Sequence, residues 1–291
     1  MKPSPQKRID AVIAWVDGGD PAWLAEKERV SAGPLADARA LRYRDWGVLQ
    51  YLFRGLERFA PWIGTVHLVT WGHLPPWLNA DCPKLHIVSH RDYIPAEYLP
   101  TFSANTIELN LHRIGALSEQ FIYFNDDMFL LRPVPAERFF RGGLPRDFAL
   151  MNPAHTLDLA NGAGDERIFY IPYNDVNHLN ARYAMRACVR RRPLRWFHPA
   201  YGVDVLRNLL LYPWPRFVGF VDSHLPQPYL KSSFAEAWAD AFAVLDATCR
   251  NPFRTDHDVN QWYIRYRQLA EGKFHPIRPL KDAVFALKED N

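Results

Sequence analysis

The hydrophobic positions of this chain form short apolar runs, separated by segments in which apolar residues recur every three or four positions. The runs have no helical periodicity and are followed by polar or turn-forming residues, which is typical of buried strands. A helix between the first two runs is predicted by its apolar repeat, with Asp45 as its cap and Pro61 at its end. The runs cover residues 9–15 (IDAVIAW), 65–70 (TVHLVT), 85–89 (LHIVS) and 120–124 (QFIYF).

The order of these elements predicts the fold class. Strand, helix, strand, strand, helix, strand is the order of an α/β fold in which a mostly parallel sheet is flanked by helices. Residues 151–180 are less regular and alternate polar turns with short apolar pieces. Two helices are expected after them, one along residues 234–245 and one over about residues 256–270. We therefore expect an α/β core with an irregular and helical C-terminal part.

Residues 99–130 place a turn, an amphipathic helix and a strand one after another. Asn105, Glu108 and His112 are spaced three and then four residues apart, so on one helix they share a face. Such a polar stripe, taken alone, is more often the solvated face of a surface helix. The strand that follows favours a binding site over a solvated helix face, because it ends in acidic residues.

Asn125, Asp126 and Asp127 follow the QFIYF strand. Ligands of open α/β sheets bind at the carboxyl ends of strands, and adjacent aspartates can reach one ligand there if the strand breaks into a turn. Carboxylates suit Mg²⁺ or Mn²⁺, which takes its other ligands from water and substrate phosphates. The alternative is a turn whose carboxylates accept only local N–H groups. Because the stripe and the acidic pair lie on consecutive elements, a metal–phosphate site is favoured.

Other polar positions each allow two interpretations. Asp17 lies in VDGGDP after the first strand, which is either the start of a nucleotide-binding α/β domain or a polar turn; without a G-x-G-x-x-G pattern, it implies no dinucleotide. His224 lies in a predicted loop, where a histidine is usually unremarkable. Arg254 and Asp258 are four residues apart, a spacing that also fits an exposed helix ion pair worth about 0.3–0.5 kcal/mol.

Composition narrows the class of protein. The formal net charge of +3 is too small to indicate nucleic acid, and three distant cysteines without a CxxC pair fit a reducing compartment. No apolar run reaches the roughly 18 residues that a spanning helix needs, so we expect a cytoplasmic protein without a transmembrane segment. An arginine cluster at residues 186–195 is by default a solvated face, although peripheral contact with a membrane or an anionic polymer is the alternative.

Three stretches resemble the first two conserved regions of the Stealth proteins: IDAVIAWVDGGD, RYRDWGVLQYLFRGLERFAPWIGTVHLVT and LPTFSANTIELNLHRIGALSEQFIYFNDDMFL. HLPQPYLKSSFAEAW and FRTDHDVNQW resemble the third and fourth regions more weakly. Stealth proteins are hexose-1-phosphate transferases, and they include capsular polysaccharide polymerases and the animal GlcNAc-1-phosphotransferase. The similarity covers most of residues 9–270.

The resemblance implies a GT-A-like α/β fold and Mg²⁺-dependent transfer of a sugar 1-phosphate. The donor would be a nucleotide-sugar, typically a UDP-sugar, and a hydroxyl of a glycan acceptor would receive the group, giving a phosphodiester and UMP in capsule or cell-surface polysaccharide synthesis. Residues 1–150 would form the nucleotide-sugar-binding core. Residues 151–291 would complete the same catalytic domain on the acceptor side.

The resemblance also implies roles for single residues. Asp127, with Asp126 or Asp258, would hold the metal, and Asp126 would also belong to the catalytic group. Arg254 and Arg113 would stabilise phosphate charge, and the acceptor proton would go to His224 in preference to His112. The positions matched to substrate binding are Asp17, Asp45, Arg54, Asn105, Glu108, Arg113 and Asn125.

The chain departs from the family pattern around Trp46, which replaces an asparagine, and Val48, which replaces a glutamate. Two rival functions therefore stay open at this point. One is a metal-dependent GT-A-type glycosyltransferase, which would attack the anomeric carbon and release UDP. The other is a non-catalytic module that binds a glycan or nucleotide.

Overall fold

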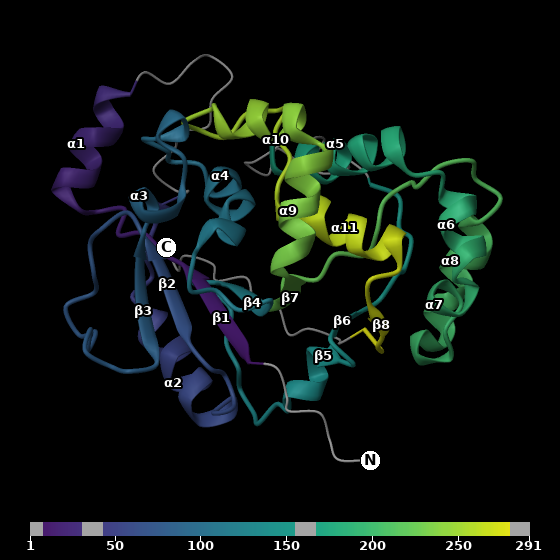
Figure 1. Cartoon of the computed structure of the whole chain (residues 1–291), viewed down its shortest axis with the longest axis horizontal. Helices are drawn as coiled ribbons and strands as arrows, with labels where there is room; N and C mark the ends of the chain where they lie inside the picture. The colour runs from purple at the N-terminus through teal and green to yellow at the C-terminus, as the bar shows by residue number, and fades with distance from the viewer. Residues whose placement is uncertain (1–7, 31–42, 155–166, 280–291) are drawn as a thin grey trace, which may run out of the picture.

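A five-stranded sheet forms the centre of the computed structural model, which describes residues 8–30, 43–154 and 167–279 (Figure 1). The strand order is β3-β2-β1-β4-β7, and the first four strands are parallel. Only β7 is antiparallel, on the edge next to β4. The predicted mostly parallel sheet is thus confirmed. Its strands are β1 Ile9–Ala14, β2 Val66–Thr70, β3 Leu85–Ser89, β4 Gln120–Asn125 and β7 Gln227–Leu230.

Both faces of the sheet are covered by helices because side chains alternate along each strand. Val12 of β1 packs into one core, and its neighbours Ala11 and Ile13 pack into the core on the opposite face. The second of these faces is covered by α2 (Leu49–Phe59). Figure 1 shows α2 on one side of the sheet and α3, α4 and α9 on the other. The helices of that side are α3 His90–Tyr93, α4 Ala104–Leu109, α9 Lys231–Asp240, α10 Phe242–Cys249 and α11 Gln261–Glu271.

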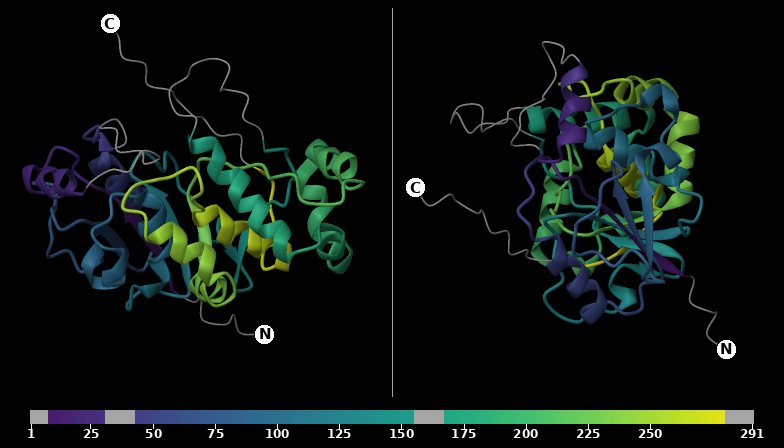
Figure 2. Two further views of the ribbon diagram at one scale, coloured as in Figure 1. Left: turned by 90° about the horizontal axis from the view of Figure 1, so that it is seen from above. Right: turned by 90° about the vertical axis from the view of Figure 1, so that its left-hand side faces the viewer.

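A second lobe lies at the end of the molecule opposite α1 (Pro21–Arg29), as both Figure 1 and Figure 2 show. Its core includes Trp196, Phe217 and Phe274, and α11 contributes Tyr266 to it while giving Ile264 to the main core. Helix α11 therefore ties the lobe to the sheet. The lobe helices are α5 Arg167–Arg182, α6 Met185–Arg191, α7 Pro193–Trp196 and α8 Val205–Leu211.

Short elements complete the fold. A three-stranded sheet has the order β5-β6-β8, with β5 at Phe140–Arg141, β6 at Leu144–Asp147 and β8 at His275–Pro276. In the described ranges, 3₁₀ segments connect longer elements at η2 Ala96–Tyr98, η3 Leu111–Arg113, η4 Ala136–Arg138 and η6 Pro199–Asp204. No helix in these described ranges is long and apolar enough to cross a membrane.

Several expected boundaries were wrong, for local reasons. Helix α2 begins at Leu49 rather than after Asp45, because Gly47 takes a left-handed conformation (φ 67°) that interrupts any earlier turn. Helix α4 ends at Leu109, where the buried Asn110 side chain donates to the carbonyl of Thr106 (2.8 Å) in competition with the helix backbone.

Three further expectations in the C-terminal half need correction. The helix expected along residues 234–245 is two helices, α9 and α10, which meet at the non-helical Ala241. The last helix begins at Gln261, because Asn260 caps it through the Trp262 amide (2.9 Å). Residues 167–180 form most of α5 and not turns, even though Pro172 lies inside that helix; residues 155–166 lie outside the described ranges.

Candidate active site at the end of the central strands

The end of β4 carries the acidic pair predicted from the sequence. The strand stops at Asn125, and the Met128 amide donates back to the Asn125 carbonyl (3.2 Å), which turns the chain at Asp126 and Asp127. Asp127 has an exposed side chain, and Asp126 is partly buried. The two carboxylates therefore lie on a turn directly after Asn125, a residue that lines a cavity; we call this edge of the cavity the mouth of the cleft.

His224 reaches this turn through strand pairing. Strand β7 runs antiparallel to β4 with Gln227 opposite Tyr123, so the residues just before Gln227 lie beside those just after β4. As a result His224 Nε2 lies 2.9 and 3.0 Å from the two carboxylate oxygens of Asp127, although 97 positions separate these residues. Strand β7 was not predicted, because Pro228 weakens the strand pattern; an edge strand tolerates proline.

The two aspartates are in different electrostatic states. Burial and the neighbouring Asp127 charge raise the pKa of Asp126 to about 6. Burial also acts against ionisation of Asp127, but the hydrogen bond and charge of His224 outweigh it and lower the pKa of the Asp127 carboxyl. Asp127 is thus the fixed anion of the pair, and Asp126 is poised to change its protonation state near neutral pH.

Glu108 and Arg254 lie deeper, in a cavity of about 150 Å³ that also opens to His224, Gln261 and Trp262. Tyr123 donates to one Glu108 oxygen (3.0 Å), and the other oxygen has no partner among the described residues. Burial raises the pKa of Glu108, and the positive charge of Arg254 opposes this rise. The cavity therefore combines a cation with a buried carboxyl group.

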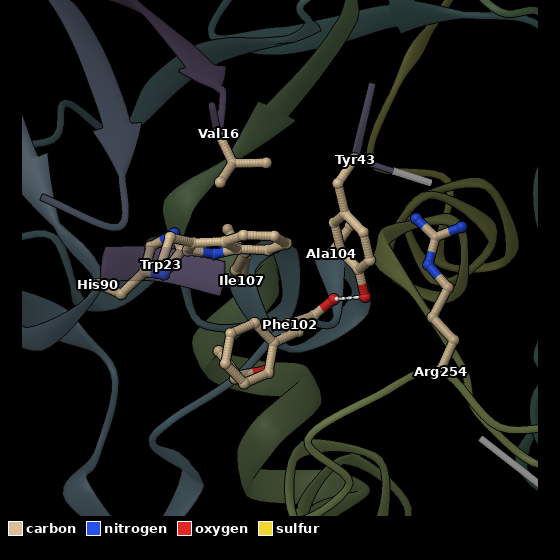
Figure 3. A pocket seen from close by; sticks show the side chains of 9 residues that line it. Val16, Trp23, Tyr43, His90, Phe102, Ala104, Ile107 and Arg254 are labelled. Atoms are coloured by element: carbon tan, nitrogen blue, oxygen red, sulfur yellow. Dashed lines mark hydrogen bonds between the residues drawn. The ribbon is translucent and has the colours of Figure 1, made fainter. Parts of the chain in front are cut away.

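Arg254 also borders a second, smaller cavity of about 90 Å³, which Figure 3 shows from close by. Its wall is aromatic: Trp23 packs edge-on against Tyr43 (4.8 Å between centroids), and the Tyr43 hydroxyl donates to the Phe102 carbonyl (3.0 Å). In Figure 3 the Arg254 guanidinium lies beside the Tyr43 ring. One arginine thus borders both the aromatic pocket and the cavity that contains Glu108 and His224.

Asp258 does not lie at the cleft surface. Its side chain is fully buried, and its two oxygens accept hydrogen bonds from Asn105 (3.0 Å), Thr255 (2.7 Å) and Asn251 (3.2 Å). These bonds fasten the loop that carries Arg254 onto α4. The expected helix spacing of Arg254 and Asp258 was wrong, since both precede α11.

Three other predicted residues are not brought to the cleft. His112 lies in η3 rather than α4 and stacks on Phe234 (6.2 Å), and its burial lowers its pKa to about 4. Arg113 donates to Asn110 (2.9 Å) and covers the Trp238 ring. Arg54 borders a separate groove against α2.

Asp17 and Asp45 lie in turns near the ends of the strands. Asp17 accepts the Gly19 amide (2.8 Å), which is the local turn that the sequence left open as an alternative. Asp45 accepts the Gly47 amide (2.8 Å) and the Trp15 indole N–H (3.3 Å), so it does not cap α2. The negative charge of Asp45 makes a smaller contribution to the raised pKa of Asp126.

Arg265 is a site residue that the sequence did not reveal. It is fully buried on α11 and holds Asp147 with two hydrogen bonds (2.8 and 2.9 Å) and Asp222 with one (2.7 Å). Because Asp222 is two residues before His224, Arg265 positions the segment that delivers the histidine. The available signal was an arginine placed directly between the apolar residues Ile264 and Tyr266.

The oxygen donors at the cleft suit a Mg²⁺ or Mn²⁺ ion only if the ion takes most of its ligands from elsewhere. Within the described ranges no three His, Cys, Asp or Glu side chains converge as a ready ion cage. Asp126 and Asp127 supply two hard oxygen donors, and Mg²⁺ commonly binds one or two carboxylates while substrate phosphates and water complete its shell. The residues present would therefore fit an ion whose remaining ligands come from water or from phosphate groups.

Comparisons with known proteins give the relatives of this chain. Residues 7–33 match the family model of Stealth protein conserved region 1, and residues 42–146 match that of conserved region 2. The capsular polysaccharide phosphotransferase WcwK of Streptococcus pneumoniae is 39% identical over 92% of this chain and 80% of its own length. The receptor polysaccharide phosphotransferase WefC of Streptococcus oralis is 38% identical, over 96% and 83%. The exopolysaccharide phosphotransferase cps2G of Lactiplantibacillus plantarum is 37% identical, over 93% and 78%.

Proposed function

Because the chain belongs to the Stealth family of polysaccharide phosphotransferases, and is an enzyme that transfers sugar phosphate, we propose that its donor is a UDP-sugar. The acceptor is a hydroxyl group of a glycan, and the products are a phosphodiester and UMP. The reaction serves the synthesis of a capsular or other cell-surface polysaccharide. We also infer that the parallel sheet belongs to the GT-A-like folds.

The observation that carries this proposal is the Asp127–His224 contact of 2.9 Å beside Asp126, at the mouth of the cavity that contains Arg254. Phosphoryl transfer requires neutralised phosphate charge and a correctly placed nucleophile more than covalent chemistry by the protein. A fixed carboxylate, an imidazole and a guanidinium around one opening meet these two needs.

His224 is the proposed general base. Its Nε2 hydrogen bond to Asp127 fixes the imidazole tautomer, so that Nδ1 is the nitrogen that takes the acceptor proton. The acceptor oxygen then forms a bond to the phosphorus that bears the sugar, and the bond from that phosphorus to the oxygen bridging to UMP breaks. His112 is a poorer candidate, because it is stacked on Phe234 away from the acids.

Arg254 stabilises the negative charge of the diphosphate from the inner side of the cleft. The aromatic pocket beside Arg254 is of a kind that accepts a flat nucleotide base. Asp126 and Asp127 are the proposed holders of Mg²⁺ or Mn²⁺, which would supply Lewis-acid neutralisation of the diphosphate when bound. We assign Asp258 to support of the Arg254 loop, since its oxygens are occupied by Asn105, Asn251 and Thr255.

A screen of nucleotide-sugars with Mg²⁺ and a set of glycan acceptors tests the proposal. We expect UMP to be released and a phosphodiester signal to appear in the phosphorus NMR spectrum of the product. Release of UDP with a new glycosidic bond would instead assign the chain to the metal-dependent glycosyltransferases. The same assay with EDTA tests the metal, because turnover that is unaffected by chelation would remove Mg²⁺ from the proposal.

A further inference from the structure

Helix α8 and its surroundings present an apolar face to solvent. Most amphipathic helices turn such a face inward, as α2 does with Leu49, Leu52 and Leu56. In α8 only Asn208 is fully buried, whereas the leucines on either side of it point outward. The outer patch, as we call it, consists of Leu194, Val203, Leu206, Leu209, Leu210 and Trp214, with exposed fractions of 52–81%.

The orientation of this helix is fixed by polar contacts of Asn208. Its side-chain amide donates to the carbonyls of Ala149 (2.7 Å) and Trp196 (2.6 Å), and its oxygen accepts the Met151 amide (2.7 Å). Breaking such a buried network costs free energy because its polar groups would lose their partners. The leucines are therefore held outward by the fold, and α8 cannot bury them by rolling over.

The same lobe is strongly basic. Residues 185–216 contain seven arginines and one acidic residue, Asp204. Two of these arginines hold the lobe together, since Arg186 donates to the Pro213 carbonyl and Arg195 donates to the carbonyls of Gly272 and Phe274. Arg190, Arg191 and Arg216 are exposed, and within the described ranges they have no ion pair.

We propose that the outer patch and its arginines dock this protein on a membrane surface that contains anionic lipid. Exposed leucines and a tryptophan on one side, with basic residues beside them, are the composition of elements that lie in the lipid headgroup region. The arginines are attracted by anionic headgroups, and each basic residue near such a surface strengthens binding about fivefold. The leucines then gain from entering the acyl boundary.

Two other occupants fit less well. A second copy of the chain, related by a two-fold axis, would set this basic patch against itself and bring like charges together. A soluble anionic polymer would satisfy the arginines but would leave the leucines in water. An anionic membrane is the partner that matches both the charge and the exposed apolar area.

Cosedimentation of the full chain with lipid vesicles tests this proposal. We expect binding to vesicles of phosphatidylcholine with added phosphatidylglycerol, and weak binding to phosphatidylcholine alone. The double variant L206S/L210S should lower the partition coefficient by roughly tenfold or more, because two apolar side chains no longer enter the bilayer. The matched control is L131S, which changes another exposed leucine in a different part of the surface and should leave binding unchanged.

A second pair of variants tests the charge. R190Q/R191Q should weaken binding to the anionic vesicles by roughly tenfold or more, whereas R58Q/R132Q, with exposed arginines outside the lobe, should not. Turnover with a soluble acceptor should be the same in all of these variants, which separates this proposal from the proposed function.

Absence of binding to anionic vesicles would overturn the proposal, and so would equal loss of binding in L131S and L206S/L210S. Sedimentation velocity without lipid tests whether a second copy of the chain is the partner of the outer patch instead. A dimer that L206S/L210S converts to monomers would assign the outer patch to a second copy of the chain instead.

Discussion

The mouth of the cleft and the buried layer behind it, which we call the wall, each pair an aspartate with a basic side chain, but for different purposes. At the mouth, Asp127 and His224 form a pair in which both side chains are about half exposed. In the wall, Asp147 and Arg265 form a pair that is almost completely buried. The first pair can exchange water for a substrate, and the second cannot. Burial and partners, more than residue type, therefore separate a reacting group from a supporting one.

The difference has an energetic consequence. Exposed ion pairs contribute little to folding, whereas removing one member of a buried pair leaves an uncompensated charge. Mutations in the wall should thus act first on stability, and mutations at the mouth should act on turnover. Each prediction below tests one side of this division.

The largest effect is expected for Arg265→Met. The change leaves Asp147 and Asp222 without their buried cation, and we expect the free energy of unfolding to fall by about 3–5 kcal/mol in urea denaturation. The matched control is Arg250→Met, whose exposed pair with Asp246 should contribute far less to the free energy of unfolding. Equal losses in the two variants would contradict the assignment of Arg265 to the wall.

His224→Ala should lower kcat by roughly 10²-fold while leaving the KM for the donor and the melting temperature nearly unchanged. The side chain is half exposed, so its removal opens no cavity in a core. His257→Ala is the control, because that histidine is exposed. Near-normal turnover of His224→Ala in steady-state kinetics would remove this residue from the role of base.

Asp126→Asn should change the pH dependence of stability. The pKa of Asp126 is raised from 3.8 to about 6 in the folded protein, so the folded state binds a proton more tightly than the unfolded state. The Asp126 carboxyl therefore contributes most favourably to the free energy of unfolding at acidic pH, and this contribution declines as the pH rises from about 4 to 6.

At pH 7.5 the asparagine variant should accordingly be more stable than the parent by roughly 1 kcal/mol, and this gain should shrink toward pH 4. Thermal unfolding at both pH values measures it. A gain in stability of the same size at both pH values would show that the raised pKa of Asp126 is not its cause.

Much of the fold could be predicted from the sequence because its strands are contiguous apolar runs. The four parallel strands were found in this way. Strand β7 and helix α5 were missed because each contains a proline, Pro228 and Pro172, that is normally a signal against such an element. Both elements form because of their place in the folded protein, which the local sequence pattern does not show. For β7, that place is the edge of the sheet.

The candidate site was predictable only in part. The acidic turn after β4 follows from the end of an apolar run, and His224 was matched to it through the family motif. The stripe of Asn105, Glu108 and His112 failed as a single surface, because the buried Asn110 ends the helix inside it. Sequence spacing could not reveal how the Asn110 side chain is held, since the same amide also donates to Cys249 Sγ (3.4 Å) on a distant helix.

The buried residues of the wall were the hardest part of the site to predict from the sequence. Asp258 looked like one half of an exposed helix pair, yet three side chains from two segments enclose its carboxylate. Arg265 is joined to Asp147 across 118 positions of the chain. Contacts of this separation depend on the finished fold and leave little trace in the local sequence.

The most direct test of the account is the turnover of Asp127→Asn in a protein whose folding is checked by its unfolding free energy. The substitution keeps the size of the side chain and removes the charge that faces His224. We predict that kcat falls by roughly 10³-fold, about 4 kcal/mol in the barrier, while the free energy of unfolding stays within about 1 kcal/mol of the parent. Turnover near that of the parent, in an equally stable variant, would contradict the assignment of the chemistry to the mouth of the cleft.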